Sequence, residues 1–289
     1  MPLLAFAAVL LAALTHATWN FAAKRAAGSK HFIWLYSIGS VIVYTPAVLW
    51  IAVTQRPEFE PRHWIALLGT SVLHLGYSLM LQAGYRASDL SLVYPLARGS
   101  GPLMSFVAAV VLLDEHMTWF SVLGVVLIVT GILLVSGLTR EPHKAPRAGI
   151  LYGLGTGVFI AAYTINDGYA VKVLLISPFF VDYFGNFFRV LVLSPGALRD
   201  RTNVAREARE YFKPAAIVST LGPLGYILVL YAMTIAPISH VAPARELATL
   251  IGAYLGARLL KEKAAPARMA GAACIVAGVV SLAFSDSGS

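Results

Sequence analysis

The chain has 289 residues, of which 58% are hydrophobic and only 12% are charged, and its mean hydropathy is +0.74. A water-soluble domain is about a quarter charged and at most half apolar, so this composition excludes an ordinary soluble protein. The formal charge of +8 would suggest a nucleic-acid partner in a soluble protein, but in a membrane protein it belongs to the loops, and we expect no such partner.

Ten apolar windows follow one another, each close to the ~20 residues that a helix needs to cross a bilayer. They cover residues 3–23, 31–53, 63–85, 90–113, 117–138, 148–170, 177–198, 212–234, 237–260 and 265–285. The hydrophilic stretch from Arg199 to Lys213 predicts a short helix at the membrane surface. We therefore predict an all-α integral membrane protein with ten transmembrane helices.

Several windows carry polar side chains, and each ionisable one costs at least ~2.5 kcal/mol at the bilayer centre, which marks it as a functional candidate. Residues three, four or seven apart share a helix face. The first half offers His16 with Asn20, His74 with Tyr77, and Tyr94 with Arg98; the second offers Tyr163 with Asn166 and Asp167, Asp182 with Asn186 and Arg189, and finally His240, Arg245 and Glu246.

The residue order in two of these windows leads to further structural predictions. Arg98 lies between Pro95 and Pro102, which predicts a bent helix whose freed backbone groups line a cavity. Arg245 and Glu246 are consecutive, so on a regular helix they differ by ~100° and cannot face the same way.

The chain repeats itself. Glu115, Gly124 and Gly131 match Glu262, Gly271 and Gly278 at an offset of 147, and neighbouring offsets relate Thr18-Trp19-Asn20 to Thr164-Ile165-Asn166 and Pro95 to Pro243. Five helices in each half is an odd number, so the second copy must cross the membrane in the opposite direction. We predict repeats over residues 1–140 and 147–286, an arrangement typical of alternating-access transporters.

Basic residues are unevenly distributed between the two sides. Fifteen lie in the loops after the odd-numbered windows, against three on the other side (Arg56, Arg62 and Lys172). Because cytoplasmic loops are enriched in lysine and arginine, this bias places both termini outside the cytoplasm.

The halves resemble the EamA domains of ten-helix members of the drug/metabolite transporter superfamily. The resemblance rests on Asn20-Phe21, on Pro95 through Leu113-Asp114-Glu115, and on Pro243 through Leu260-Lys261-Glu262, followed in both halves by the paired glycines. It implies a multi-pass protein of the cytoplasmic membrane that exports or exchanges metabolites or drugs, and many members are described with cytoplasmic termini, so the orientation stays open.

A guanidinium holds a carboxylate or phosphonate through two parallel hydrogen bonds. Three arginines and three acids inside the membrane therefore predict a transporter of a small zwitterionic or anionic metabolite, such as an amino acid or an aminophosphonate. Arg98 and Arg189 are the expected anchors for its negative group. The remaining predicted binding residues are His16, Asn20, Tyr77, Tyr94, Asn166, Asp167, Asp182, Arg245 and Glu246.

Asp182, His16 and His74 are the candidates for carrying a coupled proton. An exporter of drugs or lipophilic cations is the alternative within transporters, and a membrane enzyme that modifies lipids is the alternative outside them. Cys274 is the only cysteine and no histidine pair has ligand spacing, so no metal or cofactor is expected. Two halves complete a cavity, which leaves both a monomer and a homodimer open.

Overall fold

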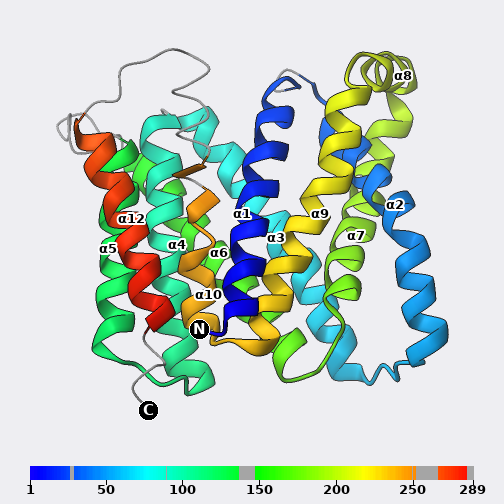
Figure 1. The fold of residues 1–289 in the computed structure, drawn as a ribbon. Helices are drawn as coiled ribbons and strands as arrows, with labels where there is room; N and C mark the ends of the chain where they lie inside the picture. Colours follow the sequence, from blue (N-terminus) through cyan, green and yellow to red (C-terminus); the bar gives the residue numbers. More distant parts are fainter. Residues whose placement is uncertain (27–28, 89, 137–146, 249, 252–265, 285–289) are drawn as a thin grey trace.

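The computed structural model describes residues 1–26, 29–88, 90–136, 147–248, 250–251 and 266–284, and these parts contain helices and no strands (Figure 1). The helices are α1 (Leu3–Lys24), α2 (Phe32–Gln55), α3 (Pro61–Ala87), α4 (Leu90–Leu113), α5 (Trp119–Ser136), α6 (Arg147–Lys172), α7 (Pro178–Arg199), α8 (Arg201–Glu210), α9 (Phe212–Ile235), α10 (Ile238–Ala244) and α12 (Pro266–Phe284).

Nine of the ten expected windows each coincide with one helix. Six helices (α1, α2, α3, α4, α6 and α9) are long and apolar enough to cross a membrane, and α5 and α12 contain shorter apolar helices. The expected surface helix is α8. The window over 237–260 differs: α10 ends at Ala244, and residues 252–260 lie outside the described part of the chain.

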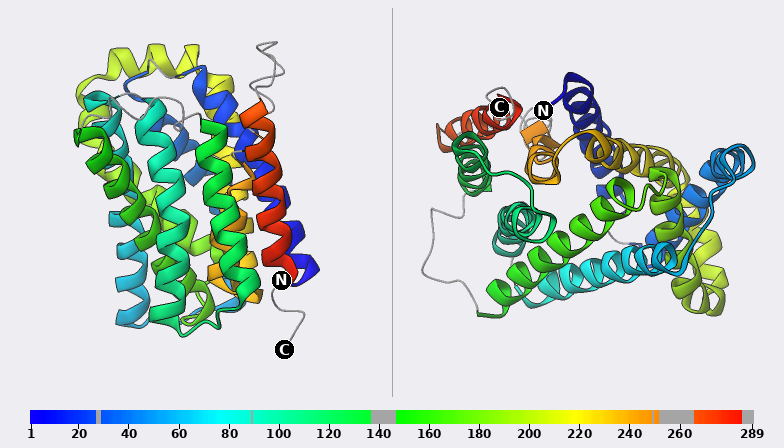
Figure 2. Two further views of the ribbon diagram at one scale, coloured as in Figure 1. Left: turned by 90° about the vertical axis from the view of Figure 1, so that its left-hand side faces the viewer. Right: turned by 90° about the horizontal axis from the view of Figure 1, so that it is seen from below.

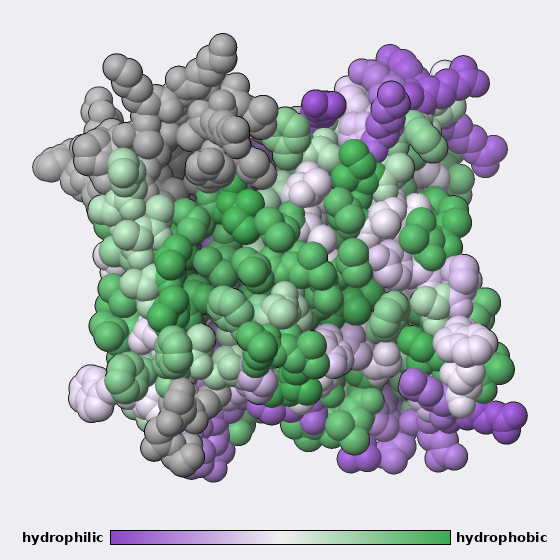
Figure 3. Space-filling view, viewed as in Figure 1, coloured by the Kyte–Doolittle hydropathy of each residue, from purple (hydrophilic) through white to green (hydrophobic). Residues whose placement is uncertain are grey.

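The outside of the bundle is apolar. Large side chains such as Trp50, Ile65 and Val111 are each at least 70% exposed. Figure 3 shows hydrophobic surface across the middle of the molecule and hydrophilic residues toward both ends. A soluble monomer rarely exposes a patch of this extent, whereas lipid covers it at no cost, so the protein is a multi-pass membrane protein.

Corresponding helices of the two halves run in opposite directions. The start of α2 lies beside the end of α7, because His31 Nε2 is 3.1 Å from Asp200 Oδ2. The end of α4 likewise lies beside the start of α10, where Glu115 accepts hydrogen bonds from two backbone N–H groups. Figure 1 shows the N-terminus and the end of α12 on one side of the bundle and α8 on the other.

The paired glycines of the repeat lie where α5 crosses α12. A Cβ on Gly131 would be 2.6 Å from the carbonyl oxygen of Gly271, and one on Gly124 would be 2.8 Å from that of Gly278. The two backbones are therefore in contact, as small residues permit in membrane helices. The short α10 packs beside α4, α5, α9 and α12 (Figure 2).

Two acids outside the membrane-spanning segments cap helix N-termini on opposite sides of the bundle. Glu207 of α8 accepts from the Ser29 hydroxyl at 2.7 Å and the His31 N–H at 2.9 Å, at the start of α2. On the other side, Glu115 accepts from Lys172 Nζ at 2.9 Å and from the N–H groups of Ile238 and Ser239, both at 2.8 Å. Both acids stabilise positive helix ends.

Replacing Glu115 with glutamine is expected to lower the unfolding free energy at neutral pH by about 1–3 kcal/mol, because charge-assisted hydrogen bonds are lost. Burial alone would raise the pKa of Glu115, but the N–H groups of Ser239 and Ile238 and the Lys172 ammonium outweigh it and lower that pKa. A lowered folded-state pKa means that this contribution is complete above the unfolded-state pKa of about 4.3 and is lost as the pH falls through the folded-state value.

Thermal unfolding in detergent should therefore show a difference in Tm between Glu115→Gln and the parent that persists down to about pH 5 and narrows below about pH 4. Asp114→Asn is the matched control, since Asp114 is exposed and asparagine tolerates its positive φ of 55°. A difference for Glu115→Gln that does not narrow in acid would argue against a charged cap.

Candidate functional site

Arg98 lies on α4 with its guanidinium between two other elements. Its Nη1 donates to Glu246 Oε1 at 3.0 Å, and its Nη2 donates to His16 Nε2 of α1 at 3.1 Å. The guanidinium carbon is 5.6 Å from the centroid of the Tyr94 ring. Arginine only donates, so His16 Nε2 must accept, which makes this imidazole neutral here.

Arg245 approaches the same carboxylate from the end of α10. Its Nη2 donates to the Tyr163 hydroxyl at 3.2 Å, and its Nε is 3.8 Å from Glu246 Oε1. That Nε is buried and has no hydrogen-bond acceptor among the described residues. The Glu246 carboxylate thus lies within ion-pair distance of both guanidinium groups.

The expectation that Arg245 and Glu246 point apart is wrong, because the two long side chains meet, with Arg245 Nε 3.8 Å from Glu246 Oε1. Helix α10 ends at Ala244, and Glu246 N then bonds to Pro243 O at 3.0 Å, which makes a tighter turn than an α-helix. Helix α4 is helical without a break from Leu90 to Leu113. The proline residues around Arg98 thus do not break the helix, whereas the chain leaves the regular helix at Arg245.

The repeat relates the two arginine sites to one another. Arg98 and Arg245 are 147 positions apart, and so are their partners His16 and Tyr163. Tyr163 was not among the predicted binding residues. The signal that could have identified it is this offset, which pairs it with His16 across the repeat.

Asp167 of α6 forms a second group of contacts. Its fully buried carboxylate accepts hydrogen bonds from Thr70 and Tyr226, from Asn166 Nδ2 at 2.9 Å, and lies 3.0 Å from His74 Nε2. The His74 ring stacks on Tyr163 with centroids 4.1 Å apart. Tyr163 therefore lies between Arg245 and His74, the histidine that contacts Asp167.

A third group lies along α7. Asn186 Nδ2 donates to Asp182 Oδ2 at 3.0 Å, and Arg189 Nη1 donates to Asn186 Oδ1 at 3.1 Å. The amide thus bridges the acid and the arginine on one helix face. Among the described contacts, none joins Arg189 to Arg98, the other anchor that the sequence suggests.

Two predicted residues lie at the margin. Tyr77 is half-buried and its ring centroid is 5.8 Å from that of Tyr163, which places it beside the arginine sites. Asn20 is exposed on α1, and no hydrogen bond joins it to the arginine sites in the described residues. Its repeat counterpart Asn166 instead donates to Ala66 O at 3.0 Å and to Thr70.

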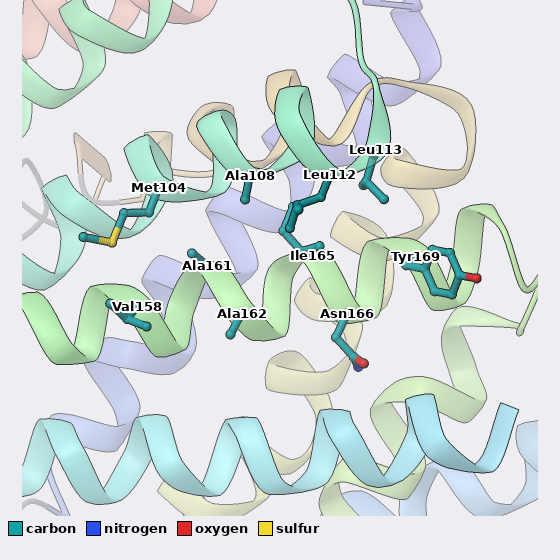
Figure 4. A pocket seen from close by; sticks show the side chains of 10 residues that line it. All are labelled: Met104, Ala108, Leu112, Leu113, Val158, Ala161, Ala162, Ile165, Asn166 and Tyr169. Atoms are coloured by element: carbon teal, nitrogen blue, oxygen red, sulfur yellow. The ribbon is translucent and has the colours of Figure 1, made fainter. Parts of the chain in front are cut away.

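A groove of about 650 Å³ lies between α4 and α6, away from the arginines (Figure 4). Its lining is apolar except for Asn166 and the Tyr169 hydroxyl, and the Asn166 amide bonds toward α3. Such a surface suits hydrocarbon rather than a charged metabolite. Charged groups of both signs meet instead at Arg98, Arg245 and Glu246.

Comparison with known proteins agrees with the helical repeat. The model of the EamA-like transporter family matches residues 3–137 and 147–284. A crystal structure of a protein that is 15% identical superposes with a TM-score of 0.71 over 98% of this chain and 97% of its own, which shows a shared fold. No curated protein matches the sequence.

Proposed function

The chain belongs to the EamA-like transporter family, and we propose that it is a secondary transporter of a small polar metabolite that carries a carboxylate or phosphonate. Transport proceeds by alternating access between two inverted five-helix halves, which together make ten membrane-spanning helices. The opposite directions of α2 and α7, and of α4 and α10, support this arrangement.

One observation carries the choice of substrate: two repeat-related arginines share one carboxylate. Arg98 and Arg245 bring two positive charges, Glu246 returns one negative charge, and His16 is neutral because it accepts from Arg98. One positive charge remains among these four side chains, and Arg245 Nε has no acceptor in the part of the chain that the structure describes. A substrate carboxylate or phosphonate would neutralise that charge and accept that hydrogen bond.

The rings around the arginines suit the rest of such a molecule. Tyr94, Tyr163 and His16 present aromatic faces or edges beside the two guanidinium groups. A substrate ammonium group can lie against such a ring, which is worth about 0.5–2 kcal/mol. The site therefore accommodates amino acids and aminophosphonates as well as simple anions.

Export of lipophilic cations is the alternative within the family. A cation at this position would lie beside two arginines and one carboxylate. The net positive charge of these three groups would repel it. The apolar groove between α4 and α6 holds no acidic side chain to attract a cation. Charge therefore favours the carboxylate substrate.

Thermal stabilisation of the purified protein tests this choice. Glycine, L-glutamate, succinate, 2-aminoethylphosphonate and tetraphenylphosphonium are added separately, because a compound that binds the folded state raises Tm by mass action. We expect at least one carboxylate or phosphonate to raise Tm and tetraphenylphosphonium to leave it unchanged. Stabilisation by tetraphenylphosphonium alone would contradict this choice and favour the export of lipophilic cations.

We place the end that bears α8 in the cytoplasm and the function in export across the cytoplasmic membrane. The exposed residues Arg199, Arg201, Arg206, Arg209 and Lys213 all lie at or beside α8. Basic residues favour the cytoplasmic side, and anionic lipid headgroups attract them.

His74 is the proton carrier that we favour. It faces Asp167, Tyr226 and Tyr163, whereas His16 is held as an acceptor by Arg98 and Asp182 is joined to Arg189 through Asn186. Histidine is the side chain that ordinarily changes charge between pH 5 and 8. A positive charge on His74 would also act on Arg245 through the intervening Tyr163.

Replacing His74 with glutamine is expected to flatten the pH dependence of ligand-induced stabilisation between pH 5.5 and 8, because glutamine cannot take up the proton that we assign to His74. Asp182→Asn serves as the comparison and should keep the pH dependence of the parent. The profiles are measured with the five compounds above. A flattened profile in Asp182→Asn and an unchanged one in His74→Gln would assign the proton to Asp182 instead.

A further inference from the structure

Glu246 is the one acid in contact with the two arginines among the described residues, and the repeat does not duplicate it. Ala97-Arg98-Gly99 corresponds to Ala244-Arg245-Glu246 at the offset of 147, so a glycine stands where the first half would carry the second acid. The Glu246 side chain is only 1% exposed, and its Oε1 is 3.0 Å from Arg98 Nη1 and 3.8 Å from Arg245 Nε. A single carboxylate thus lies between two symmetry-related cations.

We propose that Glu246 is an internal counter-ion that lets the transporter close and reorient without a substrate. This inference rests on the proposed function, because it gives the arginines a substrate carboxylate as their alternative partner. In the empty protein Glu246 reduces the charge of the site from two positive charges to one. In the loaded protein the substrate carboxylate at Arg245 and Glu246 at Arg98 together neutralise both arginines.

The physical reason is the cost of burying unpaired charge. Alternating access passes through a state that is closed on both sides, in which the site loses contact with water. Two unpaired guanidinium groups in that state repel each other and lack a counter-ion, which penalises closure strongly. With Glu246 in place, the empty protein can return, so net efflux is possible as well as exchange.

Removing the carboxylate should also create a site for a free one. In Glu246→Ala, acetate can enter the space between Arg98 and Arg245 and replace the missing group. We expect 100 mM sodium acetate to raise the Tm of Glu246→Ala by about 3 °C over 100 mM sodium chloride, and to raise that of the parent by much less. The double variant Glu246→Ala/Arg98→Ala is the control, and it should lose the difference between the two salts.

Net efflux and exchange are then compared in proteoliposomes with Glu246→Gln, which keeps the size of the side chain and removes its charge. The vesicles contain a mixture of radiolabelled glycine, L-glutamate and succinate. They are diluted into buffer either without substrate or with the same unlabelled mixture. We expect the ratio of net efflux to exchange to fall at least tenfold relative to the parent.

The outcomes separate this inference from the proposed function. An equal fall in net efflux and exchange, or no acetate-specific rise in the Tm of Glu246→Ala, overturns the role of Glu246. Absence of flux in the parent counts against the proposed substrate class, and the acetate measurement then decides on Glu246 by itself. If Glu246→Ala does not fold, the ratio of net efflux to exchange measured with Glu246→Gln decides on the role of Glu246.

Discussion

Replacing Arg245 with lysine is expected to weaken binding of carboxylate ligands about 100-fold, which corresponds to ~2.8 kcal/mol. The Nε of Arg245 has no hydrogen-bond acceptor among the described residues, while its Nη2 is held by the Tyr163 hydroxyl at 3.2 Å. A lysine ammonium is a point charge that cannot offer two parallel donors or keep the contact with Tyr163. The measurement is the ligand-dependent rise in Tm as a function of ligand concentration.

Two matched variants complete this test. Arg98→Lys should also weaken binding, because the Arg98 guanidinium joins Glu246 and His16. Arg189→Lys should leave binding near that of the parent, because Arg189 donates to Asn186 in a separate group on α7. Loss of binding in Arg189→Lys with normal binding in Arg245→Lys would move the substrate site to α7.

Adding one methyl group at Gly131 is expected to destabilise the protein by about 1–3 kcal/mol, the usual cost of overpacking. A Cβ there would lie 2.6 Å from the Gly271 carbonyl oxygen and 2.9 Å from the Ile275 backbone nitrogen. Neither backbone atom can rotate away, so α5 and α12 would have to separate along their crossing. Thermal unfolding of Gly131→Ala in detergent should show Tm lower by about 3–10 °C.

Gly196→Ala is the control for helix propensity, since nothing lies within 4 Å of a Cβ at Gly196 on α7. That variant should keep or slightly raise Tm, because alanine is the better helix former. An unchanged Tm in Gly131→Ala would mean that α5 and α12 do not approach each other as closely as described.

Much of the fold follows from simple physics of the sequence. Nine helices are located by comparing the length of each apolar segment with the thickness of the bilayer. This comparison also locates α7, although α7 carries Asp182, Asn186 and Arg189. The glycines that reveal the repeat, such as Gly131 and Gly278, recur because the two outer helices need small residues where they cross.

The site follows less completely, because helix periodicity describes one helix at a time. It groups Arg98 with Tyr94, but it does not show that Glu246 reaches Arg98 from another part of the chain. It assumes a regular helix at Arg245, whereas the chain turns there. The repeat offset contains the missing information, since it pairs Arg98 with Arg245 before any contact is known.

We propose that this protein moves a small carboxylate- or phosphonate-bearing metabolite through the site of Arg98, Arg245 and Glu246. Uptake into proteoliposomes tests it most directly, with radiolabelled glycine, L-glutamate, succinate, 2-aminoethylphosphonate and tetraphenylphosphonium offered separately to the parent and to Arg245→Lys. We expect at least one of the first four compounds to enter with the parent and the same compound to fail to enter with Arg245→Lys. Entry of tetraphenylphosphonium alone, or equal uptake by both proteins, would contradict it.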